Sequence, residues 1–268
     1  MTIREFFNQN NKDLDKNQSR DFAWLLVSKL KSEPISWDLT TIPTKMLPEI
    51  KRDLKRLKNN EPLGYILGTV PFVNCELSVT PDVLIPRSET EQLCDMIIQE
   101  YAGVPTTILD ICTGSGCIAV ALGKNLDAVV SATDISENAI KLAIQNAMAN
   151  NVAVNFYQCD LVDDRLGKFD LIVSNPPYLD KKEMDTLPAS VRDFEPKLAL
   201  FGGDDGLDFY RKLSVLAPKH LNIGGVMYLE VGDYQADKVA EILSENFDCD
   251  IVADYYGFDR FVIARSKK

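Results

Sequence analysis

Apolar side chains recur at spacings of three and four along residues 1–60, a period typical of helices that bury one face. Thr2 and Glu5 have the spacing of a capping box at a helix start. Ser19 and Thr44 precede the two longer apolar stripes and predict two further helix starts. The apolar positions are Ile3, Phe6, Phe7, then Phe22, Leu25, Leu26, Leu30, and then Leu47, Ile50, Leu54 and Leu57. Residues 1–60 are therefore predicted to form a small helical bundle.

The pattern changes at Glu61, where glycines, prolines and short β-prone runs replace the helical period. The run TVPFVNCELSV predicts a connecting hairpin near residues 69–79. We therefore expect three parts: a helical domain over residues 1–60, a hairpin linker over 61–82 and a larger domain over 83–268.

Beyond the linker, short β-rich runs alternate with helical stretches, which is typical of βαβ units around a parallel sheet. The β-rich runs are TTILDI at 106–111, AVVSATD at 128–134, VNFYQCD at 154–160, FDLIVSN at 169–175 and GGVMYLEV at 224–231. The closing segment 249–266 alternates around a glycine and predicts an antiparallel hairpin at the sheet edge. The predicted fold class is therefore α/β.

Length and composition narrow the class of protein. The 268 residues exceed one typical domain of ~150 residues, and 46% hydrophobic residues suffice for a sizeable core. No apolar run approaches the ~18 residues of a membrane span, and the opening MTIREFFNQN lacks the apolar region of a signal peptide. We expect a cytoplasmic protein, with no membrane partner, that is a monomer.

Cysteines and charge argue against two further classes of function. The six cysteines contain no C-x-x-C pair, so neither a metal nor a disulfide framework is expected. The 29 basic and 40 acidic residues give a net charge of -11. Residues 1–86 hold 12 basic and 11 acidic side chains, which leaves 17 and 29 for the rest. Such an acidic larger domain disfavours a nucleic-acid substrate.

The run 106–111 leads through Cys112-Thr113-Gly114-Ser115-Gly116 into an apolar helix. A glycine turn between strand and helix lets a ligand approach the backbone and meet free helix amides. Gly114, Gly116 and Ala119 also fit the dinucleotide pattern G-x-G-x-x-A, so a nicotinamide enzyme is an alternative. A second alternative is a tight turn between strand and helix that binds no ligand.

Acidic residues close the next two β-rich runs. Asp134 follows Gly114 by 20 residues, a position from which a carboxylate accepts the hydroxyl hydrogens of an adenosine ribose. Asp160 ends the third run, where it or the adjoining backbone reaches an adenine edge, and Leu161 supplies an apolar wall. Helix N-caps are the alternative roles for both aspartates. Three consecutive strand ends therefore predict one nucleoside site.

The fourth run ends in Asn175-Pro176-Pro177-Tyr178. Ligands of open α/β sheets bind at the carboxyl ends of strands, so this turn is predicted to face the same crevice. Two carbonyl acceptors, on the Asn175 side chain and the Pro176 backbone, suit a planar NH2 group beside the aromatic face of Tyr178. An ordinary turn is the alternative.

Asn175 to Tyr178 resemble the N-P-P-Y motif of S-adenosylmethionine-dependent amino methyltransferases, which modify adenine N6 or a glutamine amide. The whole chain is similar to the HemK/PrmC family of release factor glutamine N5-methyltransferases. The other matching segments are EPLGYILG at 61–68, VLIPR at 83–87, ETE at 89–91, EP at 195–196, GGDDGL at 202–207, LEVG at 229–232 and Gly257 with Asp259 and Arg260. The resemblance covers essentially the full length.

The resemblance implies a helical domain and a hairpin before a Rossmann-like methyltransferase domain. It implies methylation, from S-adenosylmethionine to S-adenosylhomocysteine, of the glutamine in the Gly-Gly-Gln loop of class I release factors. By position, Cys112 to Gly116, Asp134, Leu161 and Asn175 would line the cofactor site, and Asn175, Pro176, Pro177 and Tyr178 the glutamine site. Cys112 stands where the family usually has glycine, and Ser88 where it often has proline.

Orientation is expected to dominate catalysis, since an amide nitrogen is a poor nucleophile. Asn175 and Pro176, with Tyr178, are the predicted catalytic residues, and His220 is predicted to have no role as a base. The helices of residues 1–60 are predicted to dock the protein substrate, while the basic cluster within residues 51–58 is interpreted as a solvated face. Adenine-N6 methylation of a nucleic acid and a noncatalytic binding role are the alternatives.

Overall fold

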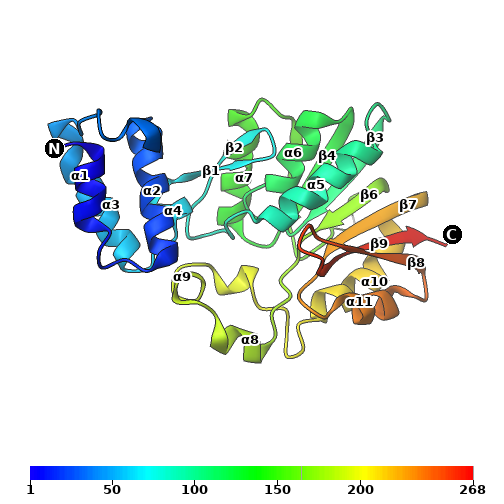
Figure 1. The fold of residues 1–268 in the computed structure, drawn as a ribbon. Helices are drawn as coiled ribbons and strands as arrows, with labels where there is room; N and C mark the ends of the chain where they lie inside the picture. The colour runs from blue at the N-terminus through cyan, green and yellow to red at the C-terminus, as the bar shows by residue number, and fades with distance from the viewer. Residues whose placement is uncertain (164, 268) are drawn as a thin grey trace. The chain divides into compact units, whose positions relative to one another are not determined.

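The computed structural model describes residues 1–163 and 165–267, which form two compact units (Figure 1). The first unit comprises Met1–Thr69 together with Pro188–Phe194. The second comprises Val70–Leu187 and the chain from Glu195 onward. Each unit is built around its own hydrophobic core.

The first unit is helical, as predicted. Its elements are α1 (Ile3–Asn10), α2 (Lys16–Leu30), the 3-10 helices Pro34–Ser36 and Thr44–Met46, α3 (Leu47–Lys58), α4 (Leu63–Leu67) and α9 (Ala189–Arg192). The capping box of Thr2 and Glu5 is confirmed. The start predicted at Ser19 is wrong, because Asp15 and Gln18 form a second capping box one turn earlier. Thr44 begins a 3-10 turn that leads into α3.

The predicted apolar stripes form the core of this unit. The buried residues are Ile3, Phe6, Phe22, Leu25, Leu26, Trp37, Ile42, Ile50, Leu54, Leu57 and Ile66. The basic cluster on α3 is mostly exposed, including Arg52, and two of its members form ion pairs. Arg52 and Arg56 contact the buried carboxylate of Asp53, and Arg56 also pairs with Glu61. Lys51, Lys55 and Lys58 are exposed.

The second unit contains a seven-stranded sheet in the order β5-β4-β3-β6-β7-β9-β8. Strands β3 to β7 are parallel, and β9 pairs antiparallel with β7 and β8. The strands are β3 (Thr106–Ile111), β4 (Ala128–Asp134), β5 (Val154–Gln158), β6 (Phe169–Ser174), β7 (Leu221–Glu230), β8 (Phe247–Ala253) and β9 (Asp259–Ser266). The predicted parallel runs and the closing hairpin are confirmed, although β5 ends two residues early and β7 begins three residues early.

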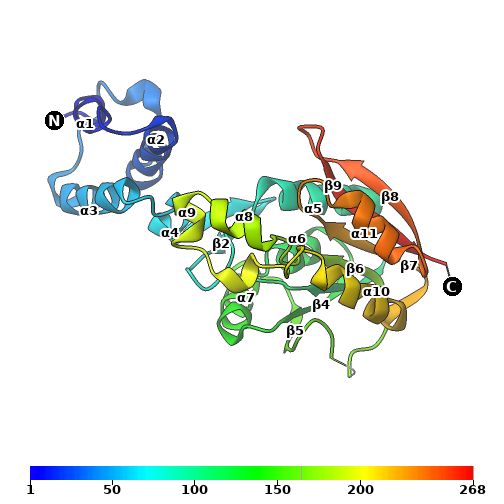
Figure 2. The ribbon, with the colours of Figure 1, turned by 90° about the horizontal axis from the view of Figure 1, so that it is seen from below.

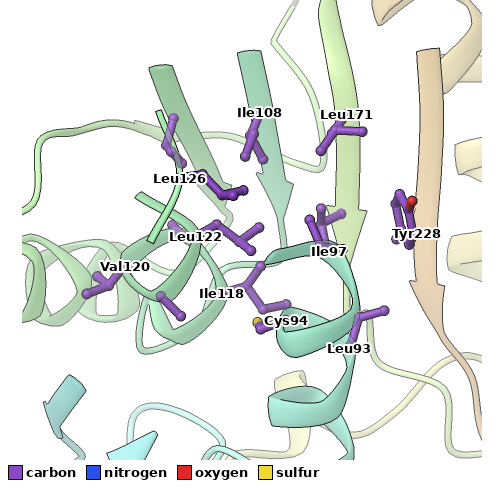
Figure 3. Packing of buried hydrophobic residues seen from close by; sticks show 14 of the residues in the cluster. Leu93, Cys94, Ile97, Ile108, Ile118, Val120, Leu122, Leu126, Leu171 and Tyr228 are labelled. Atoms are coloured by element: carbon purple, nitrogen blue, oxygen red, sulfur yellow. The ribbon is translucent and has the colours of Figure 1, made fainter. Parts of the chain in front are cut away.

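Helices cover both faces of this sheet (Figures 1 and 2). One face is covered by α5 (Ser88–Glu100), α6 (Cys117–Asn125) and α7 (Glu137–Ala149), and the other by α10 (Asp208–His220) and α11 (Ala236–Leu243). Figure 3 shows Leu93 and Ile97 of α5 packing beneath Ile108 and Leu171 of the strands. The neighbouring strand residues, such as Leu109 and Ile172, belong to the core on the opposite face. Burial of both faces explains the continuous apolar runs.

A two-stranded sheet precedes α5 at the place predicted for the hairpin. It consists of β1 (Thr69–Phe72) and β2 (Cys75–Ser78). The Asn146 side chain accepts from the Ser78 backbone N–H at 2.7 Å, which ties β2 to α7. A further short helix, α8 (Lys181–Thr186), follows β6. Over residues 1–163 and 165–267, no helix has both the length and the apolar character needed to cross a membrane.

Candidate active site

A cavity of 420 Å³ lies at the carboxyl ends of β3, β4 and β6. Its lining contains most of the residues predicted from the sequence: Cys112, Thr113, Gly114, Ser115, Asp134, Asp160, Leu161, Asn175 and Pro177. Gly116, Pro176 and Tyr178 are not among the lining residues. Several lining residues were not predicted: Pro81, Asp82, Val83, Leu84, Pro86, Thr90, Ile135, Pro196, Leu198, Ala199, Phe209 and Lys212. The structure therefore brings most of the predicted cofactor residues into one cavity, together with Asn175 and Pro177 of the turn.

The glycine-rich loop has left-handed backbone at Cys112, Gly114 and Gly116, with φ values of 62°, 56° and 81°. Each left-handed non-glycine residue costs about 1–2 kcal/mol, so a glycine at position 112 would relieve backbone strain. A Cβ on Gly114 would meet nothing within 4 Å, so a ligand can approach this part of the loop. A Cβ on Gly116 would lie 3.0 Å from Cβ of Ala143, so this glycine lets α7 pack against the start of α6.

Asp110 fixes the glycine-rich loop by hydrogen bonds and was not predicted from the sequence. Its carboxylate accepts from the Thr113 hydroxyl at 2.5 Å and from the Ala119 backbone N–H at 3.1 Å. Burial raises the pKa of this fully buried carboxyl to about 7, and the two hydrogen bonds oppose that shift. A charged residue within the apolar run 106–111 was the available signal.

Asp134 connects the ends of two strands. Its carboxylate accepts from the backbone N–H of Gly114 and from that of Ser136, both at 2.9 Å. The N-cap of α7 is Ser136, so the alternative role of Asp134 as a helix cap does not hold. Burial raises the pKa of Asp134. A carboxylate oxygen can accept two hydrogen bonds, so Asp134 still has acceptor capacity toward the cavity that it lines.

The third strand end is more exposed. Asp160 forms a salt bridge of 3.3 Å with Lys212, and no helix follows it before β6 in the described residues, so it is no helix cap. Surface pairs of this kind contribute little stability. Leu161 is buried with left-handed backbone, and its carbonyl accepts from the Thr133 hydroxyl at 2.6 Å. This bond holds the predicted apolar wall in place.

The Asn175 turn is fixed by contacts from distant segments. Nδ2 of Asn175 donates to Oγ1 of Thr90 at 2.9 Å. The Tyr178 ring packs against the core, its backbone carbonyl accepts from Gln235, and burial raises the pKa of its phenol. A Cβ on Gly202 would lie 2.7 Å from the Pro177 carbonyl oxygen, so the segment GGDDGL packs directly against this turn. The substrate roles of Pro176 and Tyr178 stay predictions.

An ion pair joins two segments of the cavity lining. Nη2 of Arg87 lies 2.6 and 2.7 Å from the two carboxylate oxygens of the buried Glu195. The lining residues Pro86 and Pro196 are adjacent to this pair in the sequence. Both partners lie in segments that matched the family pattern, but nothing in the sequence paired positions so far apart.

The remaining groups with potential for acid-base or metal chemistry are His220 and the six cysteines, of which Cys112 and Cys117 line the cavity. His220 is the last residue of α10; it is buried, does not line the cavity, and its Nδ1 lies 3.1 Å from the Gly167 carbonyl oxygen. That it is no base stays a prediction. All six cysteines are free thiols, and burial raises the pKa of Cys112 well above its usual range. Across the described part of the chain, no three His, Cys, Asp or Glu side chains are grouped to hold a metal ion.

Comparisons with known proteins place the chain among methyltransferases. Residues 90–192 match the family described as "Methyltransferase small domain". The chain is 39% identical to a release factor glutamine methyltransferase of Lactococcus lactis over 93% of this chain and 94% of that protein. A relative of the same name from Geobacter sulfurreducens is 44% identical over 78% of this chain and 75% of that protein.

Solved structures support the fold assignment. A methyltransferase from Pyrococcus furiosus superposes with a TM-score of 0.57 at 19% identity, over 83% of this chain and 98% of that one. At such low identity the likeness shows the Rossmann-like methyltransferase fold alone. The two relatives carry the closer assignment, since their identity extends over most of both chains. The chain belongs to the release factor glutamine methyltransferase family.

Proposed function

We propose that this protein transfers a methyl group from S-adenosylmethionine to the side-chain amide nitrogen (N5) of the glutamine in the Gly-Gly-Gln motif of class I release factors. One observation carries the proposal: Asn175 lines the same cavity as the glycine-rich loop and Asp134, in a chain of this family. The Asn175 side-chain amide and the predicted cofactor residues therefore line the same cavity.

The residues of the cavity fit the proposed cofactor. Gly114 leaves open space beside the loop, Asp134 offers acceptor capacity for ribose hydroxyls, and Leu161 offers an apolar surface for an adenine ring. The cavity volume of 420 Å³ falls within the ~300–1,000 Å³ of small-molecule sites. When bound, S-adenosylmethionine supplies an electrophilic sulfonium methyl and is converted to S-adenosylhomocysteine.

The chain's own contribution is to orient the glutamine amide. Its nitrogen is weakly nucleophilic because the lone pair is delocalised into the carbonyl. Acceptors at Asn175 Oδ1 and the Pro176 carbonyl would hold the two N–H bonds and direct the lone pair at the methyl carbon. The same acceptors stabilise the positive charge that develops on nitrogen. The methylated nitrogen then readily loses a proton, so this mechanism requires no strong base.

Asp134→Ala is expected to weaken S-adenosylmethionine binding by about 1.5–3 kcal/mol, or roughly 10- to 150-fold. The loss combines the missing acceptor with the released N–H of Gly114. Isothermal titration calorimetry measures the affinity directly. A dissociation constant equal to that of the wild type would show that Asp134 has only a structural role.

We also propose that the helical unit docks the protein substrate. A glutamine on a loop offers few contacts, so discrimination from other glutamines requires a second surface. Deleting residues 1–68, which include α4, is expected to lower methylation of the intact release factor by about 10- to 100-fold more than methylation of a Gly-Gly-Gln peptide. Peptide turnover and cofactor affinity control for folding. Equal losses on both substrates would contradict the docking role.

The proposed activity is tested by offering competing acceptors to the purified full chain with methyl-labelled S-adenosylmethionine. Label is expected in the release factor and absent from duplex DNA and RNA. The acidic character of the larger domain favours this outcome, because a net negative charge repels phosphates. Efficient labelling of adenine with none in the protein would instead support the nucleic-acid activity.

A further inference from the structure

A buried hydrogen-bond chain ends at Asn175. Its Nδ2 donates to Oγ1 of Thr90 at 2.9 Å, and the Thr90 hydroxyl donates to Oε2 of Glu230 at 2.7 Å. Thr90 lies in the first turn of α5 and Glu230 at the end of β7, and each is 1% exposed. These two hydrogen bonds therefore join three segments that are widely separated in the sequence.

The chemistry of the groups sets the direction of this chain. An ionised carboxylate only accepts hydrogen bonds, so Glu230 requires the hydrogen of the Thr90 hydroxyl. The Thr90 oxygen then has only lone pairs left for Asn175, which must present its NH2 group. Oδ1 of Asn175 is left for another donor, and among the described residues none donates to it. The substrate amide has the matching N–H groups.

We propose that Thr90 and Glu230 are positioning residues that fix the amide orientation of Asn175, so that Oδ1 and not Nδ2 meets the substrate nitrogen. Without them, rotation of the amide by about 180° would place a donor against the donors of the substrate. The inference rests on the proposed function, since it assigns the acceptor for the glutamine amide.

Glu230 is buried, and its backbone is fixed by a hydrogen bond. Its backbone carbonyl accepts from the Tyr210 hydroxyl at 2.9 Å. Burial raises the pKa of the carboxyl to about 7, while the Thr90 hydrogen bond opposes the shift. The pKa of Glu230 is shifted by three nearby charged residues: Glu89, Arg260 and Arg87. The charge of Glu230 in turn shifts the pKa of Tyr178, Tyr210, Cys94 and Cys117. Activity is therefore assayed at about pH 8.5, where the Glu230 carboxyl, with a pKa of about 7, is almost fully ionised.

The test is a double-mutant cycle on the full-length protein. Thr90→Val keeps the shape of the side chain but removes its hydroxyl, and Thr90→Ser restores the hydroxyl. Each is measured alone, and Thr90→Val also in an Asn175→Ala background. Thr106→Val is the matched control, because Thr106 is a buried threonine at the amino end of β3 whose hydroxyl donates to the Val104 carbonyl.

Thr90→Val is expected to lower kcat for glutamine methylation about 30-fold, the scale of a misoriented catalytic contact. Thr90→Ser should stay within about 3-fold of the wild type, and Thr106→Val within about 2-fold. In the Asn175→Ala background, Thr90→Val should have almost no further effect, because Thr90 acts through Asn175. Cofactor affinity, measured by calorimetry, should change by less than about 2-fold in Thr90→Val.

Three results would overturn the proposal: a near-normal kcat for Thr90→Val, an equally low kcat for Thr90→Ser, or an undiminished loss in the Asn175→Ala background. An undiminished loss would mean that Thr90 acts on stability or the cofactor site. A wild-type enzyme that does not methylate glutamine would overturn the proposed function itself, and this inference with it. The two failures are therefore distinguishable.

Discussion

Replacing Asn175 with alanine is expected to lower kcat for glutamine methylation by about 10²- to 10³-fold, with much less change in cofactor affinity. Asn175 lines the cavity, and its Nδ2 is held by Thr90, so Oδ1 is the acceptor that the substrate amide would meet. Alanine removes the acceptor that orients the amide and balances its developing charge. Single-turnover kinetics with saturating cofactor measure the step directly.

A half-buried asparagine outside the cavity provides the control for this experiment. Asn125 lies at the end of α6, where its Nδ2 bonds to the Ala121 carbonyl and to Asn74, and it does not line the cavity. Asn125→Ala is expected to keep a wild-type kcat. A near-normal rate for Asn175→Ala would remove Asn175 from the mechanism. An equal loss in both variants would assign the effect to the fold.

Replacing Gly116 with alanine is expected to lower the free energy of unfolding by about 2–4 kcal/mol. Two costs combine at this position. The backbone is left-handed with φ of 81°, and the added Cβ would lie 3.0 Å from Cβ of Ala143, which itself is part of a packed helix. Urea unfolding followed by circular dichroism measures the loss.

Gly114→Ala separates these two costs. Its backbone is also left-handed, with φ of 56°, but its Cβ would meet nothing within 4 Å. We therefore expect only the conformational cost of about 1–2 kcal/mol for this variant. Equal destabilisation by the two substitutions would contradict the packing that we assign to Gly116.

The sequence predicted the elements of the fold well because their patterns are local. The strand runs 106–111 and 128–134 match β3 and β4 to the residue, since the middle of each strand is buried and turns bound both runs. The start of α2 was misplaced at Ser19 because that serine also precedes an apolar stripe, and the Asp15 capping box decides the start. The boundary of a helix was therefore predicted wrongly where two local signals compete.

The candidate site was predicted only as far as it follows strand ends. Asp134 and Asn175 were found because parallel strands bring their carboxyl ends to one edge. Thr90 and Glu230 were not assigned a role, because their contact joins residues 140 positions apart. Arg87 and Glu195 are paired in the same way across 108 positions. Such contacts depend on tertiary packing, which no periodicity in the sequence encodes.

The central claim is that one cavity orients a glutamine amide for methylation, and peptide mass spectrometry of the treated release factor tests it most directly. The full-length wild-type protein, S-adenosylmethionine and an unmethylated class I release factor are incubated together, and the Gly-Gly-Gln peptide is then fragmented. The claim predicts a single methyl group on the glutamine side-chain nitrogen, and no methylation of a release factor that carries glutamate at that position. A methyl group on another residue, or none on the factor under conditions where the cofactor binds, would contradict it.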